Sequence, residues 1–301
     1  MGTFRDRLER ALNRVGDLPV LPSALHRLRQ ALSDEKTSAH DVARVMEQDP
    51  SLTAKVLRVA NSIYYAGTTG TVTSVQSAVA RLGFSEVNRL FTTLAVIRTF
   101  DHMGSHLDHN QFWKHSLTAA ITTRVIRRHC GTSDTFSEDD AYVAGLLHDI
   151  GLVVLDQYFP ALFVEVSVAA YRRRISRADA ERRILGIGHG EIGGSLLRRW
   201  RIRASVAEAV AWHHQPEKAE PKHRTLVEAV RVADFVCTSL GIGDAADGIP
   251  EGSSDAGDGT PEGLSDVAWQ DLGLSADDFS AIVQETAGEV ARSEVFVALV
   301  R

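Results

Sequence analysis

The sequence has few cysteines and no long apolar segment free of charge. Cys130 and Cys237 stand alone, without a CxxC spacing, so we expect a reducing compartment and no disulfide framework. The first residues, MGTFRDRLERALNRVG, carry charges throughout and lack the apolar centre of a signal peptide. No charge-free apolar run approaches the roughly 20 residues that a membrane-spanning helix needs. These absences predict a soluble cytoplasmic protein that does not contact a membrane.

An excess of positive charge is also missing. The 301 residues carry a formal net charge of −6, which argues against bulk attraction to nucleic acid or to an anionic membrane. The segment PSLTAKVLRVANS has the helical pattern of a DNA-reading helix-turn-helix, but its only cations are Lys55 and Arg58. We therefore expect this segment to pack in a core, and we do not expect DNA as a partner.

Short amphipathic helices separated by stop signals dominate the rest of the chain. Apolar residues recur at three- and four-residue spacing in LPVLPSALHRLRQAL, and Pro50 and Gly83 mark the limits of later segments. The polar stretch DHMGSHLDHNQ separates two helical blocks. We predict an all-α fold in which an N-terminal helical bundle, residues 1–105, packs on a second helical subdomain, residues 106–240.

The composition changes near the C-terminus. Between Arg231 and Arg292 the chain has thirteen acidic residues and no lysine or arginine. Residues 241–266 are rich in Gly, Asp, Ser and Pro, which predicts a flexible acidic loop. Residues 267–301 follow, where Ser275 is the expected cap of a closing helix.

An apolar stretch of the second subdomain, YVAGLLHDIGLVVLDQYF, holds His148 and Asp149 at its centre. A buried carboxylate costs several kcal/mol unless a cation or strong donors compensate it. Imidazole and carboxylate together are a common ligand set for divalent metals. Taken alone, however, the pair is better explained as hydrogen-bonded core residues.

Further histidines and a second carboxylate fall at inward or helix-end positions of the same block. His115 shares a helix face with Phe112 and Ala119, and Asp234 lies among apolar neighbours in LVEAVRVADFVCTSL. So many polar groups would make an unusual core without a cation. They predict a site for a divalent ion of the Fe, Mn, Ni or Zn class. The candidate ligands are His115, His148, Asp149, His189, His213, His214 and Asp234.

The order of these residues resembles the H…HD…D signature of the HD superfamily of metal-dependent phosphohydrolases. HGEIGGSLL and WHHQP are similar to the additional histidine motifs of its HD-GYP branch, whose sites hold two or three metals. Residues 17–240 most closely resemble the HDOD family of bacterial signalling modules. The segments that carry this resemblance include VARVMEQDPSLTAKVLRVANSIYY and AGLLHDIGLVVL. The resemblance implies core ligands at His115, His148, Asp149 and Asp234, and a second metal position completed by His189, His213 and His214.

The sequence departs from the HD-GYP pattern at three points. Gln111 stands where that branch has a glutamate, Leu152 replaces a lysine after the HD pair, and no Gly-Tyr-Pro segment follows His214. The resemblance therefore implies, first, a regulatory module that acts through a protein partner or a nucleotide ligand. The alternative is an active metal-dependent phosphohydrolase that acts on a nucleotide or another phosphate ester.

Lysine is absent between Tyr171 and Arg203, where ten arginines occur. Arginine suits bidentate contacts with phosphate or carboxylate better than lysine does. We interpret most of these arginines as solvated outer faces of two helices. Three of them could contact a nucleotide phosphate if they turn toward the metal site, or an acidic partner protein if they face outward. These three are Arg198, Arg199 and Arg201.

Overall fold

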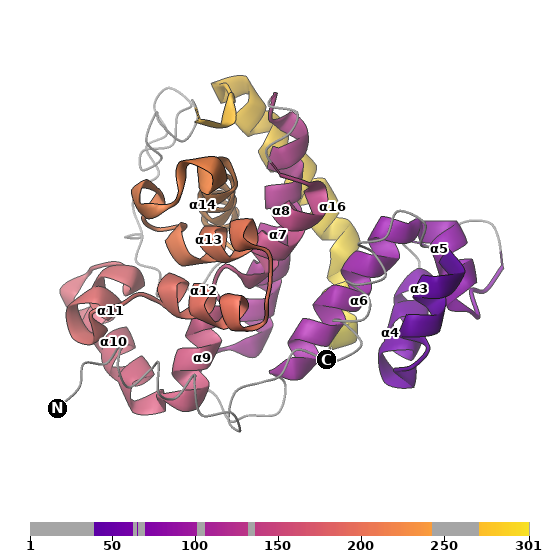
Figure 1. Cartoon of the computed structure of the whole chain (residues 1–301), viewed down its shortest axis with the longest axis horizontal. Helices are drawn as coiled ribbons and strands as arrows, with labels where there is room; N and C mark the ends of the chain where they lie inside the picture. The colour runs from indigo at the N-terminus through magenta and orange to yellow at the C-terminus, as the bar shows by residue number, and fades with distance from the viewer. Residues whose placement is uncertain are drawn as a thin grey trace. The chain divides into compact units, whose positions relative to one another are not determined.

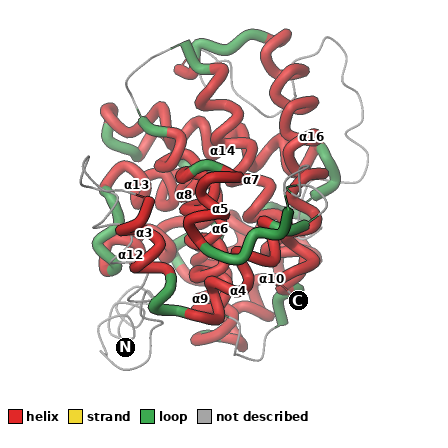
Figure 2. The backbone as a smooth tube through the Cα atoms, turned by 90° about the vertical axis from the view of Figure 1, so that its right-hand side faces the viewer, coloured by secondary structure: helices red, strands yellow, loops and turns green. Residues whose placement is uncertain are grey.

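The computed structural model describes residues 39–62, 65, 70–100, 106–131, 136–242 and 271–300. All regular structure in these residues is helical, which confirms the predicted fold class (Figures 1 and 2). The helix predicted in LPVLPSALHRLRQAL and nearly all of the predicted acidic loop lie outside the described residues.

Hydropathy gives no single helix in the described ranges that could cross a membrane. Two consecutive helical segments, Glu138–Tyr158 and Pro160–Arg173, are together long and apolar enough for a span by length and composition only, and the chain bends by 119° between them.

Contacts divide the chain into two compact units. One consists of Met1–Leu18 and Gly104–Glu289, and the other of Pro19–Met103 and Val290–Arg301. The predicted subdomain limits at residues 105, 240 and 266 stay a prediction.

The unit around Pro19–Met103 is built from short helices whose ends follow local rules. Pro50 opens its helix and the Asp49 side chain accepts a hydrogen bond from the backbone N–H of Leu52 at 3.1 Å. The side chain of Asn61 exchanges two hydrogen bonds of 2.7 Å with the backbone of Val72, which ties the loop between two helices. The helices are α3 (Ala39–Met46), α4 (Pro50–Ala60), α5 (Val75–Leu82) and α6 (Phe84–Thr99).

The unit around Gly104–Glu289 contains the candidate ligands. α7 and α8 pack against each other, α12 lies between α9 and α13, and α14 contacts α7, α8 and α13 (Figure 1). The helices are α7 (His109–His129), α8 (Glu138–Leu147), α9 (Ile150–Tyr158), α10 (Pro160–Arg173), α11 (Arg177–Leu185), α12 (His189–Arg199), α13 (Ala204–Trp212) and α14 (Arg224–Ser239). α16 (Ala276–Val300) also begins in this unit.

Glycines let these helices approach more closely than other residues would allow. A Cβ atom on Gly151 of α9 would lie 2.0 Å from the carbonyl oxygen of His189 at the start of α12. On Gly145 of α8 it would lie 2.5 Å from the carbonyl oxygen of Ala119 on α7. Because neither glycine has a side chain, α9 lies directly against the start of α12, and α8 lies directly against α7.

Ion pairs join the first part of α16 to α7. Arg128 bonds to Glu285 at 2.5 Å and to Glu289 at 2.6 Å, and His129 lies 2.9 Å from Glu285. Arg124, which is mostly buried, also pairs with Glu289. α16 is therefore attached to the helix that carries His115.

Candidate metal centre

The HD pair lies at the break between α8 and α9. His148 follows the last residue of α8, and Asp149 precedes the first residue of α9. His148 is fully buried and Asp149 is 6% exposed. Their side chains lie together, with His148 Nε2 3.2 Å from Asp149 Oδ2.

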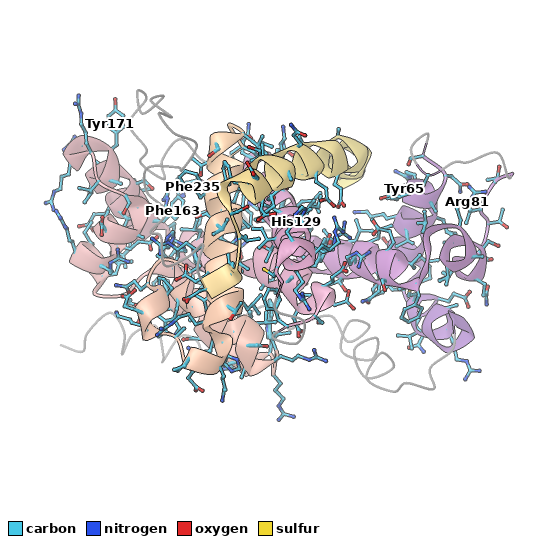
Figure 3. The ribbon with its side chains drawn as sticks, turned by 90° about the horizontal axis from the view of Figure 1, so that it is seen from above. Tyr65, Arg81, His129, Phe163, Tyr171 and Phe235 are labelled. Atoms are coloured by element: carbon cyan, nitrogen blue, oxygen red, sulfur yellow. The ribbon has the colours of Figure 1, made fainter. Side chains whose placement is uncertain are left out.

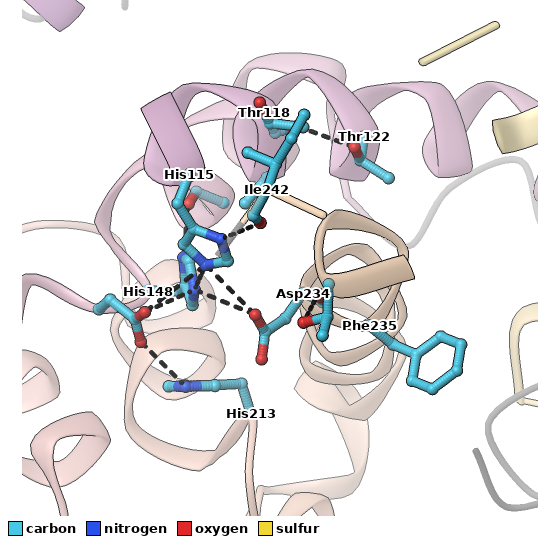
Figure 4. A network of polar contacts seen from close by, with 12 residues as sticks. His115, Thr118, Thr122, His148, His213, Asp234, Phe235 and Ile242 are labelled. Atoms are coloured by element: carbon cyan, nitrogen blue, oxygen red, sulfur yellow. Dashed lines mark hydrogen bonds and ion pairs between the residues drawn. The ribbon is translucent and has the colours of Figure 1, made fainter. Parts of the chain in front are cut away.

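One group of polar side chains gathers around this oxygen of Asp149. His115, from the second turn of α7, places its Nε2 atom 3.1 Å from His148 Nε2 and 3.6 Å from Asp149 Oδ2. Asp234 of α14 adds a carboxylate oxygen 3.2 Å from His115 Nε2. Figure 4 shows His115, His148 and Asp234 directed toward one another from three different segments.

A second group faces the other oxygen of Asp149. His189 Nε2 lies 3.1 Å from Asp149 Oδ1, and His213 Nε2 lies 3.6 Å from it. His214 completes this group, with its Nε2 atom 3.1 Å from His189 Nε2. His189 and His213 are buried, whereas His214 reaches the surface. The structure thus brings all seven predicted ligands into one cluster, with Asp149 at its centre.

The outer nitrogens of four histidines all face oxygen atoms that accept hydrogen bonds. The distances are 3.0 Å from His115 Nδ1 to the Ile242 carbonyl, 2.8 Å from His148 Nδ1 to the Gly145 carbonyl, 2.9 Å from His213 Nδ1 to the Val210 carbonyl, and 2.8 Å from His189 Nδ1 to Glu181 Oε2. A carbonyl or carboxylate oxygen only accepts, so each Nδ1 must carry the proton. In a neutral ring the Nε2 lone pair is then directed into the cluster.

Inward lone pairs need a positive partner. The buried Nε2 atom of His213 has no hydrogen-bond partner in the part of the chain that is described. The Nε2 atoms of His115 and His148 face each other at 3.1 Å, a contact that needs a proton or a cation between two nitrogens. Ring orientation fixed through Nδ1 is the usual arrangement around a metal-binding histidine.

Electrostatics show how strongly the carboxylates attract positive charge. Burial alone would lower the pKa of His115, but the hydrogen bond to Asp234 and the charges of Asp234 and Asp149 raise the pKa to about 10. Burial would raise the pKa of Asp149, yet His148, His189 and His213 hold that pKa well below its usual range. Burial lowers the pKa of His213, with His148 and His189 adding to the effect. A divalent cation would supply the positive charge that this cluster favours.

The spacing of the donor atoms fits metal coordination. Ligands about 2.1 Å from one ion are themselves roughly 3.0–3.4 Å apart in octahedral or tetrahedral geometry. Most neighbouring donors here are separated by 3.1–3.6 Å. Two sets have all their donor atoms within 4.8 Å: His115, His148 and Asp149, and Asp149, His189, His213 and His214. The residues present therefore fit a divalent metal centre.

The three arginines singled out in the sequence lie apart from this cluster. α12 begins at the buried His189, and Arg198 and Arg199 lie at its opposite end, roughly 15 Å along the helix. Both are exposed, as is Arg201 beyond them. Arg198 lies 3.8 Å from Glu208 of α13. The three arginines face outward, which is the orientation that the sequence analysis linked to an acidic partner protein. That contact stays a prediction.

Glu181 is a site residue that the sequence did not reveal. It is fully buried on α11, and its Oε2 atom accepts hydrogen bonds from the backbone N–H of His189 at 2.6 Å and from His189 Nδ1 at 2.8 Å. The surrounding arginines suggested a solvated face. The sequence nevertheless contained a signal, because Glu181 lies three residues after Ala178 and four before Leu185, on one helical stripe. The structure buries all three residues.

One of the ten arginines does not follow the predicted solvated face. Arg177 is 3% exposed, and its guanidinium group lies 5.1 Å from the centre of the Phe163 ring. A hydrogen bond of 3.0 Å to Ser167 also joins this arginine to α10. Arg177 therefore packs α11 on α10 instead of meeting solvent.

Comparison with known proteins gives a consistent match. The family model of the HDOD domain matches residues 18–216. An HDOD domain protein of unknown function from Geobacter sulfurreducens has a crystal structure with a TM-score of 0.78, at 24% identity over 95% of each chain. A protein from Marinobacter aquaeolei VT8, provisionally described as a signal transduction protein, has a TM-score of 0.78 at 25% identity over 100% of this chain and 62% of its own.

A relative of known sequence is longer than this chain. An uncharacterized protein of Treponema pallidum is 24% identical over 228 residues, which are 76% of this chain. The match spans only 44% of that relative's length. The HDOD match includes six of the seven clustered residues, and Asp234 lies beyond its end.

Proposed function

Because the chain belongs to the HDOD domain family, we propose that it is a bacterial signalling module whose metal centre has a regulatory role. The centre would hold a divalent ion or a pair of ions. Its output would be a contact with a protein partner of a signalling pathway, or a response to a bound nucleotide. The ligands would be His115, His148, Asp149 and Asp234 at one position, and Asp149, His189, His213 and His214 at the other.

The proposal rests mainly on the way the imidazole rings are held. Four separate segments each supply an acceptor for Nδ1, and each leaves Nε2 directed into the cluster. Asp149 offers one oxygen to each set of histidines, which suits a carboxylate shared by two ions. A bound divalent ion would offset the two carboxylates and join the helices that carry the ligands.

The surroundings of the cluster favour regulation over hydrolysis. Leu152 is 3% exposed in α9, so position 152 contributes no cation to a phosphate group. Gln111 is exposed at the start of α7. Among the described residues, Asp149 and Asp234 form ion pairs with histidines only. Phosphoryl chemistry depends on cations placed where charge develops, and these residues supply few.

One observation supports the alternative function, a phosphohydrolase. His214 reaches the surface, and the side chain of Asp234 is 24% exposed, so the cluster has an edge that a small phosphate ester can approach. Divalent ions at such a site stabilise charge in ester hydrolysis. In such a hydrolase, His189, His213 or His214 would serve either as a further metal ligand or as the proton donor to the leaving group.

Metal content and turnover, measured together, test the proposal. The protein would be purified without chelator, analysed for bound metals and assayed on an aryl phosphodiester. We expect at least one equivalent of metal, a loss of about tenfold or more in affinity for Asp149→Asn, and no turnover. Asp140→Asn, which alters a partly buried carboxylate of α8 that pairs with Arg203 at 2.8 Å and lies outside the cluster, is the matched control.

Each other result has a definite meaning. Turnover by the native protein that disappears in Asp149→Asn, with the helical circular dichroism unchanged, would establish the hydrolase instead. If no metal binds under any loading condition, the proposed centre is wrong, and His148 and Asp149 are a buried polar pair.

A further inference from the structure

α10 exposes apolar side chains on the face opposite its core contacts. Phe163 and Val166 are 4% and 1% exposed and pack inward. Val164, Val168 and Tyr171 are exposed by 38%, 42% and 86%, and they are the large exposed hydrophobic residues found in the described ranges. Figure 3 shows Tyr171 projecting outward at the end of its helix. Clustered exposed apolar groups of this kind mark contact surfaces.

These three side chains form one continuous stripe. Residues 164, 168 and 171 are spaced by four and three positions, so they lie on a single helix face. We call Val164, Val168 and Tyr171 the α10 stripe. It is narrow, and a helix of similar shape is the natural occupant.

Two opposite charges flank the α10 stripe on the same edge. Glu165 precedes Val168 by three residues, and Arg172 follows it by four. Positions seven apart are two helical turns apart and lie almost in line. Both side chains are exposed, and neither has an ion pair with another described residue. A carboxylate therefore lies on the N-terminal side of Val168 and a guanidinium group on its C-terminal side.

This arrangement is complementary to itself. A two-fold axis that is perpendicular to α10 and passes between the Val168 side chains of two chains packs a second α10 against the first in antiparallel orientation. Val168 then meets its own copy, and Val164 meets Tyr171 of the other chain. The charged edges of the two α10 helices then lie on the same side of the contact. Glu165 of each chain therefore faces Arg172 of the other chain, which gives two ion pairs. Isologous contacts of this type are the commonest basis of homodimers.

We infer that the α10 stripe is a docking surface for the α10 stripe of a second copy of this chain. An acidic partner protein would match Arg172 but would place like charge against Glu165. An anionic lipid surface would meet the same repulsion. Only a partner with both charges in reversed order satisfies both, and the chain itself has that order. The inference does not depend on the proposed metal centre.

A contact made by one helix from each chain buries little surface, so the dimer should be weak. Sedimentation velocity on the full chain, from about 1 µM to about 500 µM, would measure it. We expect the weight-average mass to rise toward twice that of the monomer. Glu165→Arg alone and Arg172→Glu alone should each stay monomeric, because each places like charges opposite one another.

Mixing the two single variants gives the sharpest test. One chain then has only cations at positions 165 and 172, and the other has only carboxylates, so both cross-chain pairs are restored. We expect the equimolar mixture to dimerise although neither component does. Arg183→Glu, a charge reversal at an exposed position of α11, should dimerise like the native protein.

Several outcomes would overturn the inference. A native chain that stays monomeric at the highest concentration would do so, as would a dimer that both single variants leave unchanged. Failure of the mixture to associate would exclude the antiparallel register. Cosedimentation of the monomeric chain with phosphatidylserine vesicles, lost in Tyr171→Ala, would assign the stripe to a lipid surface instead.

Discussion

Glu181 differs from the other acceptors around the histidine cluster because it brings a negative charge to the outer side of His189, one of the proposed ligands. The Ile242, Gly145 and Val210 carbonyls fix ring tautomers without adding charge. Glu181 fixes the His189 tautomer and also makes the ring more basic: burial would lower the pKa of His189, but Glu181 and Asp149 hold it well above its usual range. A more basic imidazole is a better metal ligand. His189 should therefore be the histidine whose metal bond depends most on a neighbouring residue.

Replacement of Glu181 by glutamine tests this role. Glu181→Gln keeps an oxygen that can accept from His189 Nδ1 but removes the charge. Loss of such an outer partner typically costs 10–100-fold in metal affinity, so we expect a decrease of about tenfold or more. Competition with a chromogenic chelator measures it.

The matched control is Glu191→Gln. Glu191 also lies beside His189 in sequence, but its side chain accepts a hydrogen bond from the backbone N–H of Gly188 at 3.3 Å. The control should bind metal like the native protein. Equal affinities for both variants would show that the Glu181 charge does not tune the centre.

At the scale of helices, the cluster depends on how closely α9 approaches α12. Gly151 lies against the backbone of His189 and Gly193, where a Cβ atom would be 2.0 Å from a carbonyl oxygen and 3.0 Å from an amide nitrogen. A side chain can rotate away from a clash, but a helix backbone cannot. A methyl group at position 151 must therefore push α12 away from α9 and take His189 with it.

Gly151→Ala should lower both stability and metal affinity. Overpacking of a tight core typically costs 1–3 kcal/mol, and the backbone clash places this variant at about 3 kcal/mol or above. Urea unfolding of the metal-free protein, followed by circular dichroism, measures the change.

Gly288→Ala provides the contrast on α16. Apart from the neighbouring backbone of α16 itself, no atom lies within 4 Å of a Cβ at that position, so the change should stabilise the protein by up to about 1 kcal/mol through the unfolded chain. Similar gains in stability for the two variants would mean that helix propensity, and not the contact between α9 and α12, decides the outcome.

At the scale of the whole molecule, the sequence predicts more of the fold than of the site. Pro50 and Gly83 mark helix ends by local rules, and the structure places helix limits at these residues. Helix formation depends on neighbours in sequence, so such signals are visible without a structure. The histidines and carboxylates of the cluster could also be predicted, because their residue types are rare on apolar helix faces.

The arrangement within the cluster depends on contacts that no local pattern contains. Glu181 lies in an arginine-rich segment, and only its contact with His189 shows its role. Position 198 is on the same helix as His189, yet only the helix length and direction place Arg198 far from the cluster. The two oxygens of Asp149 face different sets of histidines, and this too follows from the packing of α7, α12 and α13 around the break between α8 and α9.

A metal ion at this centre would join elements that are distant in the chain. Its ligands extend from position 115 on α7 to position 234 on α14, so a bound ion closes long loops and stabilises the native state by mass action. At a free metal concentration of 100 times Kd, that stabilisation is about 2.7 kcal/mol. Chelation should therefore loosen the unit that contains the cluster.

Hydrogen exchange with and without a chelator measures this effect helix by helix. We expect dipicolinate to accelerate amide exchange where the ligands lie, at the break between α8 and α9 and at the start of α12. The α3 and α4 helices contribute no ligand, so their exchange should change little. Readdition of metal should restore protection in the native protein but not in Asp149→Asn. Exchange that is insensitive to chelation throughout the Gly104–Glu289 unit would contradict a stabilising ion, because an ion bound to three separate segments must slow their separation.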